Sequence, residues 1–321
     1  MVDPAAARKS ASKKRLRWED VPAVTRSVVE RLAGGQVLAA TNCTGGFSPG
    51  LASRLALADG REVFVKAMDA AEWPDQVTFY RAEALVSASL PAHVPAPRLL
   101  GSSDDGRWVV LVFECIDGTE PDLRRRPEDA FLVAVALDDL AAVLTPAPVA
   151  VPSGHPRLGG WADLAANSDR LAQLPALSPW AEANLTTLID LEAAGVAAAL
   201  GDSLVHFDAY PHNILLAADR VWFVDWPHAR RGAPFIDLIL FASAAAAAGI
   251  GPEKLLAGRA CTAGMEPGAI DAVLAAHAGF CFSGCLCLPA TQAFAPIIAA
   301  KAELGTAATA WLRRRLDRSG I

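Results

Sequence analysis

The stretch 204–216 constrains this chain more than any other, because polar residues interrupt two apolar runs within it. Its polar residues follow the pattern His-x-Asp-x-x-x-x-Asn, made by His206, Asp208 and Asn213. A short apolar strand is predicted at 221–224, and it runs directly into Asp225. We therefore expect two strand ends to bring Asp208, Asn213 and Asp225 together.

These residue types suit the transfer of a phosphoryl group. A carboxylate can orient an attacking hydroxyl and accept its proton, and oxygen ligands can hold the Mg²⁺ that neutralises nucleotide phosphates. We assign the catalytic carboxylate to Asp208 and the metal ligands to Asn213 and Asp225. The alternative is a loop in which Asp and Asn cap turns and His206 bonds a backbone carbonyl.

The region resembles the aminoglycoside phosphotransferase and choline kinase-like family. In that family the segment reads His-Gly-Asp-x-x-x-x-Asn, then Ile-Asp-Trp, then Gly-x-Pro-x-x-Asp-Leu, and the last motif lies at 232–238 here. The resemblance extends from about Trp18 to Trp311. It implies that Asp237 anchors a helix and a loop through hydrogen bonds. Phe207 departs from the pattern, because the family usually has glycine at this position.

The resemblance implies an α+β, bilobal protein-kinase-like fold. We expect a small lobe with a five-stranded antiparallel sheet plus a helix, and a large, mainly helical lobe. A chain of 321 residues is long enough to bury two such cores. The expected parts are a disordered basic tail at 1–17, an N-terminal nucleotide-binding lobe at 18–113, a hinge at 114–120, and a C-terminal catalytic and substrate-binding lobe at 121–321.

In the small lobe, apolar runs and turn residues predict strands and one inserted helix. The strands are expected at 36–42, 51–57, 63–66, 98–102 and 108–113, and the helix at about 75–90. The loop after the first strand contains Gly45, Gly46 and Ser48, whose backbone amides and hydroxyl could approach phosphate oxygens. An ordinary hairpin turn would have the same composition.

Lys66 ends an apolar strand, at the position where kinase-like enzymes keep the lysine that holds nucleotide phosphates. Glu83, on the predicted helix, is its expected partner, and Glu72 is the alternative. By themselves, both residues could equally be solvated surface charges. The resemblance further implies that the base of ATP or GTP meets backbone groups between Glu114 and Ile116.

The charge distribution bears on the partners. The net charge is −6, and residues 1–17 contribute +5, which leaves −11 for the rest of the chain. An acidic body disfavours nucleic acid and anionic membranes and attracts cationic small molecules. We expect a small hydroxylated acceptor that could be cationic, such as an aminoglycoside or another antibiotic. A choline, sugar or homoserine kinase, or a non-catalytic nucleotide-binding module, is the alternative.

The six cysteines show no disulfide framework, and no apolar signal segment precedes them, so we expect reduced thiols and a cytoplasmic monomer or homodimer. The apolar run 238–250 is too short to cross a membrane and predicts a buried helix. Periodicity, prolines and glycines predict the helices of the large lobe. These helices are expected at 127–144, 179–200, 236–249, 252–263, 268–288 and 291–316.

Overall fold

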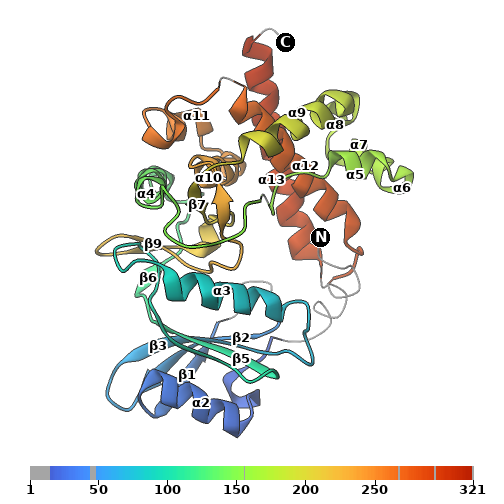
Figure 1. Ribbon diagram of the computed structural model, residues 1–321. Helices are drawn as coiled ribbons and strands as arrows, with labels where there is room; N and C mark the ends of the chain where they lie inside the picture. Colours follow the sequence, from blue (N-terminus) through green and yellow to red (C-terminus); the bar gives the residue numbers. More distant parts are fainter. Residues whose placement is uncertain (1–14, 44–47, 155, 267, 293, 320–321) are drawn as a thin grey trace. The chain divides into compact units, whose positions relative to one another are not determined.

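The computed structural model describes residues 15–43, 48–154, 156–266, 268–292 and 294–319 (Figure 1). Gly45, Gly46 and the first fourteen residues of the basic tail lie outside these ranges. The chain divides into two compact units. Unit 1 comprises the chain up to Thr119 together with Leu215–His228, and unit 2 comprises Glu120–Ile214 and the chain from Ala229 onwards. The segment 215–228, expected in the C-terminal lobe, thus lies with unit 1.

Unit 1 contains the expected five-stranded antiparallel sheet, with the strand order β1-β2-β3-β5-β4. The strands are β1 (Val37–Asn42), β2 (Leu51–Leu57), β3 (Glu62–Asp69), β4 (Leu99–Asp104) and β5 (Trp108–Glu114). Helix α3 (Val77–Ser89) covers one face, and α2 (Ala23–Ala33), preceded by the short η1 (Trp18–Asp20), covers the other (Figure 1). Pro22 lies between η1 and α2 and precedes the first residue of α2.

The alternation of side chains along β3 decides which of its residues face which helix, because successive strand residues point to opposite faces. Val63, Val65 and Ala67 are buried in the cluster that includes Val29 and Ala33 of α2. The residues between them share the other face, where Met68 is buried with Val77 and Tyr80 of α3. Lys66 is one of these alternate residues, so its side chain lies on the face of the sheet that α3 covers.

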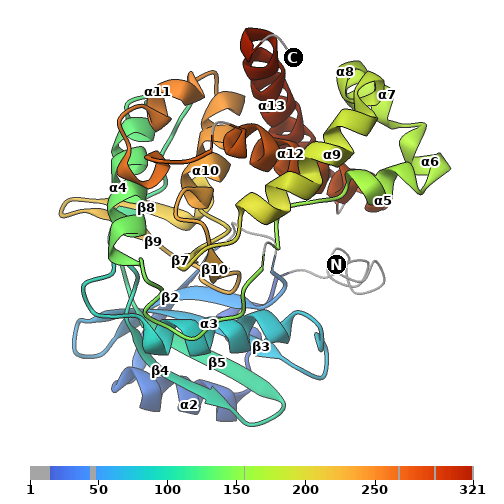
Figure 2. The ribbon, with the colours of Figure 1, turned by 45° about the horizontal axis from the view of Figure 1, so that its top comes forward.

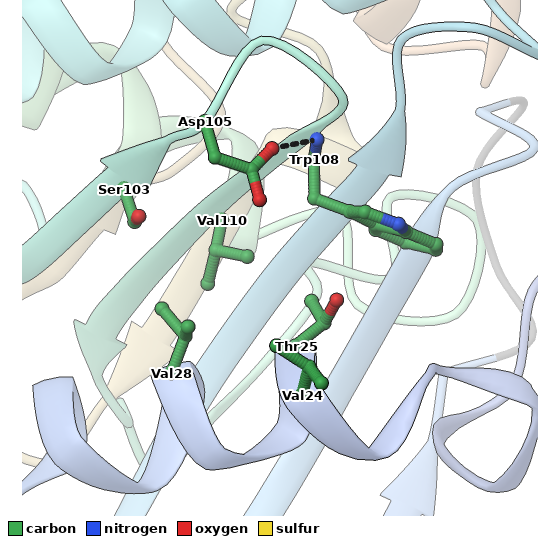
Figure 3. A pocket seen from close by; sticks show the side chains of 7 residues that line it. All are labelled: Val24, Thr25, Val28, Ser103, Asp105, Trp108 and Val110. Carbon is green, nitrogen blue, oxygen red and sulfur yellow. Dashed lines mark hydrogen bonds between the residues drawn. The ribbon is translucent and has the colours of Figure 1, made fainter.

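A shallow hollow on unit 1 lies between α2 and the β4–β5 turn (Figure 3). Its lining residues are Val24, Thr25, Val28, Ser103, Asp105, Trp108 and Val110. The backbone N–H of Trp108 donates to Asp105 Oδ1 at 2.7 Å, which closes the turn. None of the site residues expected from the sequence lines this hollow, so it does not serve the predicted chemistry.

A three-stranded sheet carries the predicted strand that precedes Asp225. Its strand order is β6-β8-β9, with β6 at Gly118–Thr119, β8 at Ile214–Ala217 and β9 at Val221–Phe223. The backbone N–H of Phe223 donates to the Pro95 carbonyl at 2.8 Å. This contact fixes the end of β9, and with it Asp225, to unit 1.

Unit 2 is mainly helical, as expected. Its helices are α4 (Asp129–Val143), α5 (Trp161–Ala165), α6 (Ser168–Leu171), α7 (Leu174–Leu177), α8 (Pro179–Ala183), α9 (Leu185–Ala198), η2 (Pro211–Asn213), α10 (Ile236–Ala247), α11 (Pro252–Leu256), η3 (Ala260–Thr262), α12 (Ala269–Cys287) and α13 (Ala295–Ser319). The antiparallel pair β7 (Ser203–Val205) and β10 (Arg230–Gly232) completes it. Helix α10 is almost entirely buried, which confirms the helix predicted from the apolar run.

Two helices of unit 2 are shorter than predicted. The helix expected at 179–200 is divided into α8 and α9 at Asn184, whose side chain donates to the Trp180 carbonyl. The helix expected at 252–263 ends at Leu256, because Gly258 adopts a left-handed backbone with φ of +73°. The short helices α5, α6 and α7 were not predicted, since each spans only one or two turns.

Helix α12 is the centre of unit 2 and packs beside α9 and α13 (Figures 1 and 2). Among the described helices it is long and apolar enough to cross a membrane, but 61% of its most apolar window is buried inside the structure. Gly195 allows α9 to approach it closely, since a Cβ atom there would lie 2.2 Å from the Ala272 carbonyl oxygen. The apolar sequence of α12 is therefore explained by packing in the core.

Candidate active site

Lys66 is the centre of the ionic group in unit 1. Its Nζ lies 2.7 Å from both carboxylate oxygens of Glu83 and 2.9 Å from Asp225 Oδ1. The Lys66 and Glu83 side chains are 13% and 4% exposed, whereas that of Asp225 is 43% exposed. The structure thus brings together three of the residues that the sequence predicted separately, and it leaves the Asp225 carboxylate accessible to solvent.

The charges within this group depend on one another. Burial alone would lower the pKa of Lys66, but the carboxylates of Asp225 and Glu83 raise it above its ordinary value. Burial raises the pKa of Glu83, and the Lys66 ammonium opposes that effect. Lys66 therefore stays cationic at neutral pH, as a lysine that binds phosphate must.

Asp225 adopts a left-handed backbone with φ of +67°. A residue other than glycine in this region costs roughly 1–3 kcal/mol and is found mostly where the surroundings hold it in place. Here β9 ends two residues earlier at Phe223, which is bonded to Pro95, and the Asp225 side chain is bonded to Lys66. The turn directs the carboxylate towards Lys66 at the end of the strand.

Ser48 lies at the base of the predicted phosphate loop. Its hydroxyl is 3.0 Å from Tyr80 Oη on α3 and accepts the Gly50 N–H at 3.3 Å. Gly50 has no room for a side chain, since a Cβ atom there would lie 2.7 Å from the Ala67 carbonyl oxygen and 2.4 Å from Tyr80 Oη. The loop base is thus held close to β3 and α3, and Tyr80 is a contributor that no sequence motif indicated.

Glu114 and Ile116, predicted to meet the nucleotide base, have defined contacts within unit 1. Glu114 N–H donates to the Arg98 carbonyl at 3.0 Å, and its side chain accepts from Arg98 N–H at 2.7 Å. The Ile116 carbonyl accepts from Arg54 at 3.0 Å. These bonds fix the backbone conformation after β5, and a role in base binding stays a prediction.

In unit 2, the His-x-Asp-x-x-x-x-Asn motif forms a loop held by its own polar residues. Asp208 N–H donates to His206 Nδ1 at 3.2 Å, and Asn213 Nδ2 donates to the Asp208 carbonyl at 2.9 Å. All three residues are buried. His206 therefore braces the loop through its ring nitrogen. Asn213 uses its amide nitrogen in the loop and retains Oδ1, the atom that could bind a metal.

Asp237, at the start of α10, anchors the same loop. Its two carboxylate oxygens accept the backbone N–H groups of His206 and Phe207, each at 2.8 Å. Burial raises the pKa of Asp237 to about 7; the two backbone hydrogen bonds lower it, and the Asp208 charge adds to the rise. The structure confirms the helix-to-loop hydrogen bonds expected from the resemblance.

The raised pKa of Asp237 predicts a pH dependence of stability. A carboxyl group that ionises less readily in the folded than in the unfolded state costs stability as it becomes charged. The free energy of unfolding should therefore fall between about pH 4 and pH 7, relative to Asp237→Asn, which does not titrate. Urea denaturation of both proteins across this range measures the difference. If the free energy of unfolding changed with pH in the same way in the wild type and in Asp237→Asn, a raised pKa of Asp237 would be contradicted.

Phe207 occupies the usual glycine position with φ of +60°, and its ring is fully buried. A Cβ atom added at Gly232 would lie 3.2 Å from the Phe207 ring, so glycine at 232 makes room for it. A buried phenylalanine side chain stabilises a fold by about 3–5 kcal/mol relative to alanine, and the left-handed backbone costs only about 1–2 kcal/mol. Packing therefore outweighs strain in this loop.

This balance predicts an unusual order of stabilities. Phe207→Ala removes the ring and keeps the strain, whereas Phe207→Gly also relieves the strain. Phe207→Gly should therefore be less destabilising than Phe207→Ala by about 1 kcal/mol, the reverse of the usual preference for alanine. Chemical denaturation measures both variants. A glycine variant less stable than the alanine variant would show that the backbone is not strained.

Arg157 is a residue of this site that sequence reasoning missed. Its Nη2 lies 2.8 Å from Asp208 Oδ2. It comes from the loop before α5, next to a proline-rich stretch without periodicity, so no local signal connected it to Asp208. The carboxylate predicted to be catalytic is therefore paired with a guanidinium within unit 2.

The predicted magnesium ligands are Asn213 and Asp225, and both side chains carry oxygen atoms, the ligand type that Mg²⁺ prefers. In the described ranges, no group of three or more His, Cys, Asp or Glu side chains is placed to hold a metal ion. Mg²⁺ at phosphotransfer sites usually binds one or two carboxylates together with substrate phosphates, and Asn213 Oδ1 in unit 2 and the accessible Asp225 carboxylate in unit 1 are each a suitable type of ligand. The donor set fits. Asn213 belongs to unit 2 and Asp225 to unit 1, and their joint action remains a prediction.

A five-stranded antiparallel sheet with the Lys66–Glu83 pair, followed by a mainly helical unit, defines a protein-kinase-like fold. The sequence model described as "Phosphotransferase enzyme family" matches residues 45–269, more than half of the chain. The chain therefore belongs to this family. No curated protein is significantly similar to it in sequence.

Solved structures share the fold at low sequence identity. A choline/ethanolamine kinase family protein from Mesorhizobium loti has a TM-score of 0.53 and 17% identity, covering 90% of this chain and 99% of that one. A putative fructosamine-3-kinase from Haemophilus somnus 129PT has a TM-score of 0.52 and 12% identity, covering 87% and 96%. Amicoumacin kinase in complex with AMP-PNP and Ca²⁺ has a TM-score of 0.50 and 8% identity, covering 87% and 92%. At these identities the similarity concerns the fold alone.

Proposed function

We propose that this chain transfers the γ-phosphoryl group of ATP or GTP to a hydroxyl group of a small molecule. The observation that carries the proposal is the buried Lys66, held between Glu83 and the accessible Asp225. Such an arrangement keeps a cation and an oxygen ligand ready beside each other, as phosphate and metal binding require. Family membership supports the same reaction class.

Each predicted residue has a role in this proposal. Lys66 binds nucleotide phosphates, with the loop that contains Gly45, Gly46 and Ser48 beside them. Backbone groups from Glu114 to Ile116 bind the base. Mg²⁺, when bound through Asn213 and Asp225, would neutralise charge on the phosphates.

Asp208 is the proposed catalytic residue for the acceptor. Its carboxylate orients the acceptor hydroxyl, whose oxygen forms a bond to the γ-phosphorus while the bond to the β–γ bridging oxygen breaks. The hydroxyl proton passes to Asp208, and the nucleoside diphosphate leaves. The hydrogen bonds from Asn213 and to His206 keep the loop in one conformation for this role.

The fold does not select the acceptor. The three similar structures are described as kinases of amicoumacin, fructosamine, and choline or ethanolamine, which are chemically different molecules. An aminoglycoside or another antibiotic therefore stands as one candidate class beside choline, sugars and homoserine. A cytoplasmic location without nucleic-acid or membrane partners completes the proposal.

The test is phosphoryl transfer by the purified full-length chain with Mg²⁺ and γ-labelled ATP or GTP. The acceptor panel contains aminoglycosides, peptide and nucleoside antibiotics, choline, amino sugars and homoserine, and Asp208→Asn is the control. We expect label on at least one acceptor and none above background with the control. Nucleotide binding without transfer to any acceptor would instead indicate a non-catalytic module.

A further inference from the structure

Two cations and an aromatic ring lie beside Asp208 in unit 2. Arg157, paired with Asp208, has its guanidinium carbon 5.7 Å from the centroid of the Phe280 ring. Lys301 Nζ lies 3.7 Å from the same centroid. The loop before α5 carries Arg157, α12 carries Phe280, and α13 carries Lys301. We refer to Arg157, Phe280 and Lys301 as the basic cluster.

The basic cluster has more positive than negative charge. Arg157 pairs with Asp208, but no carboxylate forms an ion pair with Lys301 in the part of the chain that the structure describes. The nearby Cys281 thiol is neutral, since burial raises its pKa to about 12. Burial lowers the pKa of the neighbouring His277 to about 4, so it is uncharged at neutral pH.

The basic cluster also has hydrogen-bond donors in excess. The buried Nε–H of Arg157 has no acceptor among the described residues. The Lys301 ammonium contacts the face of an aromatic ring, and burial lowers its pKa, which shows that its surroundings do not compensate its charge fully. An unpaired, half-buried cation beside a second cation is unfavourable unless an anion binds there. Arg157 and Lys301 together therefore carry one more positive charge than the Asp208 carboxylate neutralises.

We propose that the acceptor binds to unit 2 through an anionic group, a carboxylate or a phosphate, held between Arg157 and Lys301. Its carbon skeleton lies against Phe280, and its hydroxyl reaches Asp208. The inference rests on the proposed function, in which Asp208 receives the acceptor hydroxyl. Arg157 pairs directly with Asp208, so the anionic group and the reactive hydroxyl belong to one short molecule, such as a hydroxy acid or a sugar phosphate.

This acceptor class differs from the cationic one that the net charge suggested. A net charge averages over the whole surface, whereas a bound molecule interacts mainly with charges closer than about a Debye length of 8–10 Å. Arg157 and Lys301 are two such charges near Asp208, and both would repel a polyamine or an aminoglycoside. The guanidinium also offers the paired donors that carboxylate and phosphate groups accept.

The experiment compares four small molecules that share a hydroxyl group and differ in charge. Glycerol is neutral, glycerate carries a carboxylate, glycerol 3-phosphate carries a phosphate, and choline is a cation. Binding to the full-length chain is measured by calorimetry, and phosphoryl transfer from labelled ATP or GTP is measured in parallel. The variants are Lys301→Met, which removes the charge and keeps the stem, and Lys301→Arg, which restores a cation. Arg313→Met, an exposed position on the same helix, is the matched control.

We expect glycerate, glycerol 3-phosphate or both to bind more tightly than glycerol and choline. Lys301→Met should weaken that binding by roughly 10- to 100-fold, the value of one hydrogen bond to a charged group. Lys301→Arg should recover most of it, Arg313→Met should change nothing, and the KM for the nucleotide should stay the same. Comparing glycerate with glycerol 3-phosphate identifies whether the basic cluster prefers a carboxylate or a phosphate.

The inference is overturned if no anionic probe binds the wild-type protein more tightly than it binds Lys301→Met, or if choline binds best. It is also overturned if Lys301→Met raises the KM for the nucleotide and leaves the acceptor unaffected, since the cluster would then bind the donor phosphates. Anion binding that depends on Lys301, without phosphoryl transfer to these probes or to any acceptor of the wider panel, would support the anion site and contradict the proposed function.

Discussion

Replacing Asp208 with asparagine is expected to lower kcat for phosphoryl transfer by roughly 10²–10⁴-fold, the usual contribution of a general base. Asparagine has the same shape but cannot accept the proton of the acceptor hydroxyl. The backbone groups of residue 208, which bond His206 and Asn213, are unchanged by the substitution. The loop should therefore persist, and the loss should appear in kcat while the affinity for nucleotide is retained.

Steady-state kinetics and nucleotide titration measure this effect, with urea denaturation to verify the fold. Asp202→Asn is the matched control, because Asp202 is an exposed carboxylate of unit 2 that also pairs with an arginine, Arg231. It should keep nearly full activity. A kcat for Asp208→Asn within about threefold of the wild type would exclude Asp208 as the general base.

Replacing Lys66 with methionine is expected to remove activity and also to destabilise unit 1. The substitution takes away the cation that is proposed to bind phosphate and leaves Glu83, which is 4% exposed, without this partner. Breaking a buried ion pair by removing one member costs about 3–5 kcal/mol. The measured value should lie at the lower end, because Glu83 can take up a proton and so avoid an unpaired buried charge.

The destabilisation by Lys66→Met should grow as pH rises. Without Lys66, burial keeps the pKa of Glu83 above its ordinary value of 4.5, so stability falls as pH rises from that ordinary value towards the raised pKa and is unaffected below it. Denaturation at several pH values tests this, and Lys66→Met/Glu83→Gln should remove the dependence. Arg81→Met is the matched control on α3, where an exposed pair with Asp104 contributes only about 0–1 kcal/mol. If Arg81→Met and Lys66→Met lowered the free energy of unfolding by similar amounts, a special role for the buried Lys66–Glu83 pair would be contradicted.

Much of the fold could be predicted from local patterns in the chain. The five strands of unit 1 follow from alternating apolar runs bounded by Gly, Pro and Asp, and β2 was predicted with its observed bounds, Leu51–Leu57. Lys66 and Glu83 were predicted as partners from their order along the chain, and the structure confirms the pair. Asp237 was likewise expected to bond the loop after β7. These features are readable because periodicity and motif spacing extend over only a few residues.

Other features depend on contacts between distant parts of the chain. Arg157 and Asp208 are 51 residues apart, and Lys301 lies on a third element, so no spacing in the sequence predicts that they meet. The left-handed backbone of Phe207 is likewise maintained by the hydrogen bonds of Asp237 and the space over Gly232. The low intrinsic preference of phenylalanine for a left-handed backbone would have excluded this conformation.

The sequence by itself indicated the reaction class, since the order of Lys66, Asp208, Asn213 and Asp225 follows the motif order of the phosphotransferase family to which the chain belongs. The charge next to Asp208 was decided only by the tertiary structure. The sequence shows an acidic body, yet folding places Arg157 and Lys301 around one aromatic ring beside that carboxylate. The physical reason is that net charge sums over all residues, whereas binding depends on the few charges that folding brings within several ångströms of the ligand.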